Sequence, residues 1–301
     1  MDLLIIFSAS ILPLFIIIAV AFIYYRLAHP DVSPIANLAT MVFVPAFVFH
    51  ALMKREFTAT MLIKPLIFMI LLTGSLMLLA YFLGKVIKAR EDERITLILA
   101  SSMINVGNFG LPLIYFAYGT GAEAYSALNF IAFNIPLSTV AIYLCSKEKG
   151  IVKILKDIAK IPIFYALVTA VCIAELGISI PKPLFQCIEL MGSAAMPLLI
   201  FTLGLQLSRI KLRFDDFKIF IPGILIRLFV SPLIAWFFLN WLEFPDLPLK
   251  ISLVQTSAPA ALLPLMYAIR FDRSPDLLAA MIMFTTVFGG FSLTVLIKML
   301  G

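Results

Sequence analysis

The segment SSMINVGNFGLPLIYFAYG, residues 101–119, is apolar and long enough to cross a membrane, but its middle is unsuited to a continuous helix. Glycine and proline weaken helices, and asparagine side chains compete for backbone hydrogen bonds. Residues of these types are Asn105, Gly107, Asn108, Gly110 and Pro112. Because an unpaired backbone group is costly in hydrocarbon, a break at this depth requires protein or a water-filled cavity around it.

A second segment of this kind, VQTSAPAALLPLMYA, covers residues 254–268 and contains Pro259 and Pro264. Interrupted helices in corresponding positions of two halves are the best sequence indication of a binding site in a secondary transporter. Two ordinary proline kinks, common in membrane helices, are the alternative. We predict that 101–119 and 254–268 are broken helices near the membrane centre that together form the active centre of a transporter.

The composition is that of a helical membrane protein. Apolar residues make up 62% of the 301 residues and charged residues 13%, against about 25% charged in typical soluble domains. Apolar runs of about 20 residues, the length of a membrane-spanning helix, recur from end to end. We predict an all-α polytopic fold of ten transmembrane helices, at 3–25, 34–53, 62–86, 95–118, 124–145, 162–180, 184–208, 219–242, 249–269 and 276–299.

The distribution of Lys and Arg between the loops predicts the orientation. One set of alternate loops carries 16 of the 23 basic residues, the other set carries 6, and Arg227 lies inside a predicted span. Basic loops face the cytoplasm. We therefore expect a multi-pass protein of the cell (inner) membrane, with both termini outside the cytoplasm. No soluble element carries a basic cluster, so no nucleic-acid partner is expected.

The two halves of the chain repeat each other. A shift of 152 residues places Pro45 on Pro197, and LPL at 111–113 on LPL at 263–265. Five spans per repeat is an odd number, so the second repeat must enter the membrane from the opposite side. The pattern predicts an inverted-topology repeat.

We therefore divide the chain into a first five-helix repeat at 1–145, a cytoplasmic linker at 146–161 and a second, inverted five-helix repeat at 162–301. Within GIVKILKDIAKIP (150–162), apolar residues follow helical spacing and charged residues occupy the opposite face. This pattern predicts an amphipathic helix at the lipid surface. A plain linker helix and a regulatory lipid sensor are the two interpretations.

Several motifs together resemble the auxin efflux carrier family. They are NVGNFGLPL (105–113), FTLGLQLS (201–208), RLFVSP (227–232), SAPAALLPLMYA (257–268) and SPDLLAA (274–280), and VPAFVFH (44–50) is similar to the plant members, the PIN proteins. The resemblance covers nearly the whole chain. It implies a ten-span fold similar to bile acid:sodium symporters and sodium/proton antiporters, in which two broken helices cross and organic anions are carried. Bacterial members include malate permeases.

The resemblance also implies a scaffold of helices 1, 2, 6 and 7 that forms a homodimer, and a moving unit of helices 3–5 and 8–10. Ile104 and Ala260 stand where plant carriers have proline and glutamine, and the central loop is short. We therefore expect a compact, prokaryote-type member, for which auxin is not the expected substrate.

Polar side chains at the two breaks are the candidate substrate-binding residues. They are Asn105 and Asn108 in the first break and Thr256 and Ser257 in the second, with Gln255 as a weaker candidate. A broken helix exposes free N–H groups and a positive dipole end, which suit a carboxylate. Capping of the broken helix is the alternative role for Asn105. The crossover itself is assigned to Gly107, Gly110, Pro112, Pro259 and Pro264.

Two ionisable residues inside the spans are further candidates. Arg227 lies roughly 13 Å deep at about 1.5 Å per residue, where it either attracts the anion or holds backbone carbonyls. His50 is either packed and hydrogen-bonded or a proton relay. Residues 101–119 and 254–268 contain no Asp or Glu, so no obligatory sodium site is expected. No catalytic, metal-ligand or cofactor motif is found, so neither an enzyme nor a metal or cofactor site is expected.

These features predict a secondary transporter that moves a small organic anion across the lipid membrane by elevator-type alternating access. One charge crossing the membrane potential gains about 2.3 kcal/mol per 100 mV. An inside-negative cell would therefore drive an anion outward without a coupled ion. A sodium- or proton-coupled organic acid symporter, and a non-transporting ligand sensor on the same fold, are the alternatives.

Overall fold

The computed structural model describes residues 2–54, 58–145, 161–210, 217–271 and 273–301. Within these residues the chain is helical, and its only extended pairing is one antiparallel bridge between Ile104 and Ala260. Except for Ile161, the predicted linker lies outside the described residues.

Sixteen α-helices make up the described chain. Those of the first half are α1 (Leu3–Ile6), α2 (Leu12–Ala28), α3 (Val32–Leu38), α4 (Val44–Met53), α5 (Ile63–Val86), α6 (Glu91–Ser102), α7 (Leu111–Tyr118) and α8 (Glu123–Cys145). Those of the second half are α10 (Pro162–Glu175), α11 (Lys182–Ser193), α12 (Ala195–Leu207), α13 (Phe217–Leu225), α14 (Ser231–Trp241), α15 (Asp246–Thr256), α16 (Leu263–Phe271) and α17 (Pro275–Leu300).

Four π-helical turns in the described chain each end two residues before a proline. Proline lacks an N–H group and clashes with the carbonyl four residues earlier, and an inserted residue relieves that clash within a continuing helix. The turns are η1 (Phe7–Ile11) before Pro13, η2 (Ala39–Phe43) before Pro45, η4 (Val106–Gly110) before Pro112 and η6 (Ile226–Val230) before Pro232.

Seven of the resulting helical stretches in the described chain are long and apolar enough to cross a membrane. They are Leu3–Ala28, Val32–Met53, Thr60–Val86, Thr120–Cys145, Lys182–Leu207, Phe217–Trp241 and Pro275–Leu300. An eighth apolar helix, α10, is shorter, with 14 residues. The chain is therefore a polytopic helical membrane protein.

The two remaining predicted spans are each interrupted. The first consists of α6, then η4 and α7, and the second consists of α15 and α16, with non-helical backbone between the halves. Helices after the breaks begin at matching places: α7 and α16 begin at Leu111 and Leu263, and α8 and α17 begin at Glu123 and Pro275. Both pairs follow the offset of 152 residues read from the sequence.

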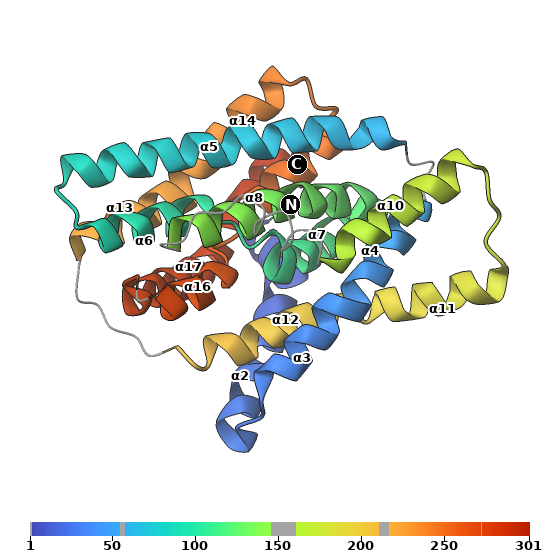
Figure 1. Cartoon of the computed structure of the whole chain (residues 1–301), viewed down its shortest axis with the longest axis horizontal. Helices are drawn as coiled ribbons and strands as arrows, with labels where there is room; N and C mark the ends of the chain where they lie inside the picture. Colours follow the sequence, from blue (N-terminus) through green and yellow to red (C-terminus); the bar gives the residue numbers. More distant parts are fainter. Residues whose placement is uncertain (1, 55–57, 146–160, 211–216, 272) are drawn as a thin grey trace.

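Helix packing can be described in two groups, which contact each other through α4 on α8 and α12 on η4 and α7. In one group α2 packs on α12, and α4 packs on α10 and α11; in the other α5 packs on α6, α8 and α14, and α6 also contacts α13 and α17. Figure 1 shows α4, α10 and α11 toward one end of the molecule, α6, α13, α16 and α17 toward the other, and α7 and α8 between them.

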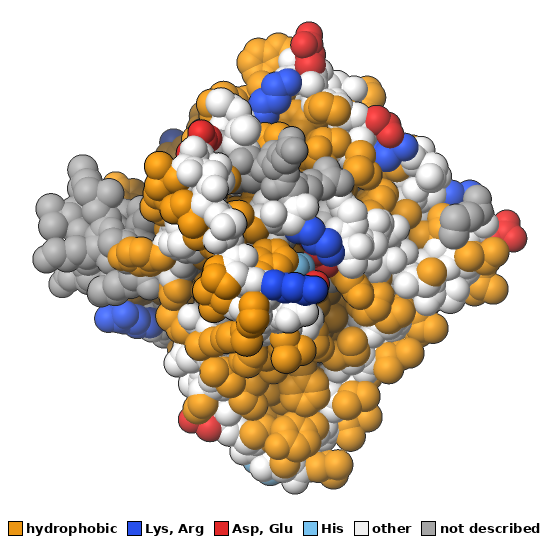
Figure 2. All heavy atoms as spheres, turned by 90° about the vertical axis from the view of Figure 1, so that its right-hand side faces the viewer, with side chains coloured by type: hydrophobic (Ala, Val, Ile, Leu, Met, Phe, Trp, Pro, Cys, Tyr) orange, Lys and Arg blue, Asp and Glu red, His pale blue; other side chains and the backbone are white. Residues whose placement is uncertain are grey.

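The outer surface is largely apolar. Figure 2 shows one face covered mostly by hydrophobic side chains, with a few charged groups at its centre and its edges. Exposed large apolar residues occur on α10 and α11, among them Tyr165, Val168, Leu184 and Leu190. Such a surface is suited to contact with lipid acyl chains.

Candidate functional site

The two helix breaks lie directly against each other. The Asn105 N–H donates to the Pro259 carbonyl at 2.8 Å, and the Ala261 N–H donates to the Met103 carbonyl at 2.8 Å. Each break therefore pairs backbone groups that the other would leave unsatisfied in the membrane. At this point the C-terminal ends of α6 and α15 and the N-terminal ends of η4 and α16 come together.

Two glycines allow the first break to pack closely. A Cβ atom on Gly107 would lie 2.7 Å from the ring of Phe130 on α8, and one on Gly110 would lie 3.0 Å from Cγ of Gln255 on α15. Any larger residue at Gly107 requires that its neighbour shift. These glycines bring η4 into direct contact with α8 and α15.

The prolines occupy equivalent places after the breaks. Pro112 is the second residue of α7 and Pro264 is the second residue of α16, and both are buried. Proline suits the place of Pro264 because the first N–H groups of a helix have no intrahelical acceptor, whereas Pro112 follows the π-helical turn η4 that runs into α7. Pro264 thus favours a helix that begins at the second break over one that runs through it.

Asn105 holds the first break together through its backbone. Besides the bond to Pro259, its carbonyl accepts from the Gly110 N–H at 2.9 Å. The residue is only 6% exposed, its side chain makes no capping bond to η4, and its Nδ2 amide has no hydrogen-bond partner among the described residues. A buried donor without a partner is destabilising. This amide is therefore available to a ligand that enters the break.

The hydroxyls of the second break are engaged within their own helix. Thr256 and Ser257 each donate to the carbonyl four residues earlier, both at 2.7 Å. A hydroxyl has a single proton, so neither donates to an anion while these bonds persist. Asn108 is partly exposed. Of the four predicted binding residues, Asn105 has the geometry best suited to a ligand.

Gln255 joins three elements around the breaks, a role that the sequence analysis did not assign. It is fully buried, and its amide donates to the carbonyls of Val106 at 3.2 Å and Ser126 at 3.1 Å. Asn129 donates to Gln255 Oε1 at 3.1 Å and to Ser252 Oγ at 3.0 Å.

The sequence contained a signal for this network. Ser126 and Asn129 on α8, and Ser252 and Gln255 on α15, are polar pairs three residues apart in apolar helices. Residues at that spacing share a helix face. Two such faces in a membrane protein are expected to pair with each other.

Arg227 lies on η6 and contacts the two half-helices that end at the breaks. It is fully buried, and its guanidinium donates to the Ser101 carbonyl at 3.2 Å, to Ser231 Oγ at 2.7 Å and to the Thr256 carbonyl. No carboxylate pairs with it within the described ranges. Of the two predicted roles, this geometry is that of a residue holding backbone carbonyls.

Two polar residues of α12 also lack partners for buried atoms. They are the Thr202 hydroxyl and the Gln206 side-chain carbonyl, each unpaired in the part of the chain that the structure describes. The opposite side of α12 is close to α2, since a Cβ on Gly204 would lie 2.5 Å from the Ile18 carbonyl oxygen. Thr202 and Gln206 are two positions from Gly204 and therefore lie on the side of α12 away from α2, and α12 also packs on η4 and α7.

His50 makes its contacts with α11. Its ring lies 5.2 Å from that of Phe185, and its Nε2 atom is 3.5 Å from Glu189 Oε1. The side chain is buried, whereas that of Glu189 is half exposed. The structure thus pairs His50 with a carboxylate on a neighbouring helix of its own group.

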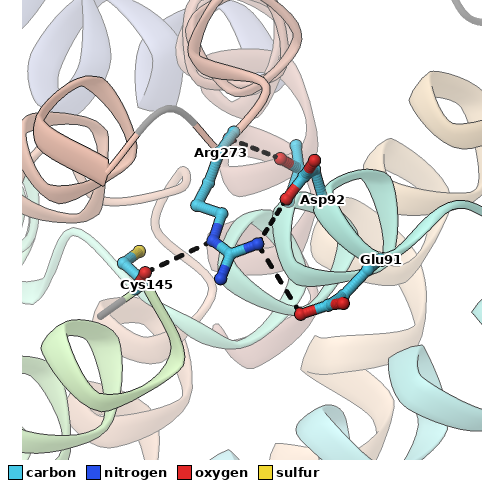
Figure 3. A network of polar contacts seen from close by, with 5 residues as sticks. Glu91, Asp92, Cys145 and Arg273 are labelled. Atoms are coloured by element: carbon cyan, nitrogen blue, oxygen red, sulfur yellow. Dashed lines mark hydrogen bonds and ion pairs between the residues drawn. The ribbon is translucent and has the colours of Figure 1, made fainter. Parts of the chain in front are cut away.

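Arg273 joins ends of α6, α8 and α16 that lie away from the breaks. Arg273, which follows α16, forms ion pairs with Asp92 at 2.5 Å and Glu91 at 3.6 Å in the first turn of α6, and donates to the Cys145 carbonyl at the end of α8 at 3.3 Å (Figure 3). Acidic residues are favourable in the first turn of a helix. The network fixes α6, α8 and the end of α16 to one another.

Comparisons with known proteins agree with this architecture. The family model for membrane transport proteins matches residues 6–153 and 147–297. A protein of Methanocaldococcus jannaschii described as an uncharacterized transporter is 28% identical over 261 residues, covering 84% of each chain. An uncharacterized transporter of Methanothermobacter thermautotrophicus is 25% identical over 272 residues, covering 87% of this chain and 86% of its own. The predicted resemblance to auxin efflux carriers is confirmed, and the chain belongs to the membrane transport protein family.

Proposed function

We propose that this chain is a secondary transporter for small organic anions and that it binds a carboxylate where the two helix breaks meet. The observation that carries the proposal is the Asn105 amide, a buried donor without a partner at the break. The N-terminal ends of η4 and α16 reach the same point. Free N–H groups and positive dipole ends at such positions favour an anion.

The proposed fold has ten membrane crossings, in two inverted repeats, with both termini outside the cytoplasm. The equal offset of the helix starts after each break supports the repeat. In this proposal the group that contains α2, α4 and α10–α12 is the scaffold and the homodimer interface. The group that contains the breaks moves as an elevator and exposes the anion alternately to each side of the membrane.

Hydrogen-bonded and ion-paired side chains around the breaks join several helices, which supports the proposal that these helices move as one unit. Gln255 and Arg227 tie α6, α8, α14, α15 and η4 together near the breaks, and Arg273 ties the start of α6 to the ends of α8 and α16. The proposed scaffold contacts the site where α12 packs on η4.

A proton-coupled organic acid symporter is the second candidate function. Its supporting observation is the His50–Glu189 pair, in which a histidine buried in the membrane region lies 3.5 Å from a carboxylate. Histidine is the side chain whose charge changes most readily near neutral pH. In that case the direction of transport would follow the pH gradient.

The test begins with purified protein and a thermal-shift screen of monocarboxylates, dicarboxylates and matched amides. Any acid that stabilises the protein is then used in proteoliposomes, where unlabelled acid inside should drive accumulation of labelled acid by exchange. Stabilisation by a carboxylate but not its amide, followed by saturable exchange, supports the proposal. Stabilisation without exchange would support a sensor, and stabilisation by none of the acids would refute anion binding.

A further inference from the structure

The environment of Arg227 is unusual for a buried charge. Its side chain is the largest fully buried one in the described chain, yet no carboxylate is among its partners there. A charge removed from water is strongly destabilising unless other groups compensate it. The compensation here comes from oxygen atoms that carry no formal charge.

Two of those oxygens are free because the helices are broken. The carbonyl of Ser101 would ordinarily accept from the N–H of Asn105, but that N–H donates to Pro259 instead. The carbonyl of Thr256 would accept from the N–H of Ala260, which donates to Thr285 Oγ1 at 3.2 Å. Both freed carbonyls accept from the Arg227 guanidinium.

The charges balance without an acidic residue. The C-terminal end of a helix is equivalent to about half a negative charge, and the guanidinium contacts the ends of both α6 and α15. Two half-helix ends therefore offset roughly one positive charge. Arginine suits the position because it stays protonated and its planar donors reach several acceptors at once.

We propose that Arg227 is a tethered cation, occupying the place that a dissociable coupling ion such as Na⁺ would take between the two half-helices. Carbonyl and hydroxyl oxygens, the groups that surround it, are the ligands preferred by hard cations. The inference rests on the proposed transport function, because it explains how an anion carrier works without an external cation. The net charge moved per cycle is unchanged, since the guanidinium returns with the empty unit.

The proposal predicts that removing the side chain converts an ion-independent protein into a cation-dependent one. Wild type and the Arg227→Ala variant are compared in Na⁺, K⁺, millimolar guanidinium and the bulky cation N-methylglucamine. We expect the melting temperature and the anion exchange of wild type to be the same in all four. For Arg227→Ala we expect both to be lowest in N-methylglucamine and to rise, saturably, with guanidinium or Na⁺.

Two further variants keep the test decisive. Arg227→Lys retains a tethered charge and should stay cation-independent, with reduced exchange because an ammonium lacks the planar fork. Ser231→Ala removes one partner of the guanidinium but keeps the charge, so no cation dependence should appear. The proposal is overturned if wild type requires Na⁺, if Arg227→Lys is as impaired as Arg227→Ala or does not fold, or if folded Arg227→Ala ignores all cations.

The thermal measurements need no transport. A wild type that carries no anion would therefore refute the proposed function while leaving the cation test of Arg227 intact.

Discussion

Replacing Asn105 by alanine should remove substrate binding while leaving the fold intact. Its Nδ2 amide has no partner among the described residues, so the folded protein loses no hydrogen bond with it. The backbone bonds of Asn105 to Pro259 and Gly110 do not depend on the side chain. We expect the free energy of unfolding to change by less than about 1 kcal/mol.

The expected loss of affinity follows from one hydrogen bond to a carboxylate. Such a bond contributes about 1.5–3 kcal/mol, and each 1.4 kcal/mol is about tenfold in the dissociation constant. Asn105→Ala should therefore weaken carboxylate binding by roughly 10- to 150-fold. Calorimetric titration of the acid found by thermal shift measures this, together with exchange in proteoliposomes.

Asn129→Ala is the matched control. It also removes a buried amide, but one that bonds Ser252 at 3.0 Å and Gln255 at 3.1 Å. We expect it to destabilise the protein by about 2–4 kcal/mol, with affinity per folded molecule nearly unchanged. Equal affinity in Asn105→Ala and wild type would remove Asn105 from the site. A stability loss in Asn105→Ala as large as that of Asn129→Ala would show that its amide has a structural partner.

Three further predictions concern the breaks and the topology. Gly107→Val should abolish anion exchange, since even its Cβ would lie 2.7 Å from Phe130; unaltered exchange would show that this contact is dispensable. Pro112→Ala should slow exchange, because alanine restores the N–H that proline lacks and lets the π-helical turn η4 close as an ordinary α-helical turn, which shifts the break; an unchanged rate would contradict that role. On a background without native cysteines, Glu148→Cys should react with an impermeant reagent only from the cytoplasm and Lys182→Cys only from outside, as the 16-to-6 distribution of basic residues predicts; labelling of both from one face would refute the ten-span topology.

The breaks could be located from sequence because each is marked by residues that a continuous membrane helix tolerates poorly. The helix ends at Ser102 and Thr256 and the restarts at Val106 and Leu263 lie within the two segments predicted. Local composition contains this information, since glycine and proline act on their own backbone.

The partners of polar side chains could not be read in the same way. Thr256 and Ser257 were predicted to face a ligand, yet their hydroxyls bond within α15. Gln255, the weaker candidate, bridges α8 and η4. Which of several adjacent residues on a helix faces a neighbour depends on helix rotation and packing, and these are set by contacts far apart in sequence.

The two roles considered for Arg227, anion attraction and the holding of backbone carbonyls, could be distinguished only once its hydrogen-bond acceptors were known. The carbonyls of Ser101 and Thr256 belong to segments 126 and 29 residues away in sequence. Their availability results from how the two breaks pair with each other, which no local pattern encodes.

Efflux from proteoliposomes under an imposed membrane potential tests the central claim most directly. Vesicles loaded with the identified acid are given potassium–valinomycin potentials, without sodium and without a pH gradient. A monoanion carried alone should distribute by nearly fiftyfold per 100 mV, since one charge gains about 2.3 kcal/mol. We expect the distribution to follow the imposed potential in wild type, and the rate to fall in Asn105→Ala. A distribution that ignores voltage, or that changes only when sodium or a pH gradient is supplied, would contradict transport of an anion alone.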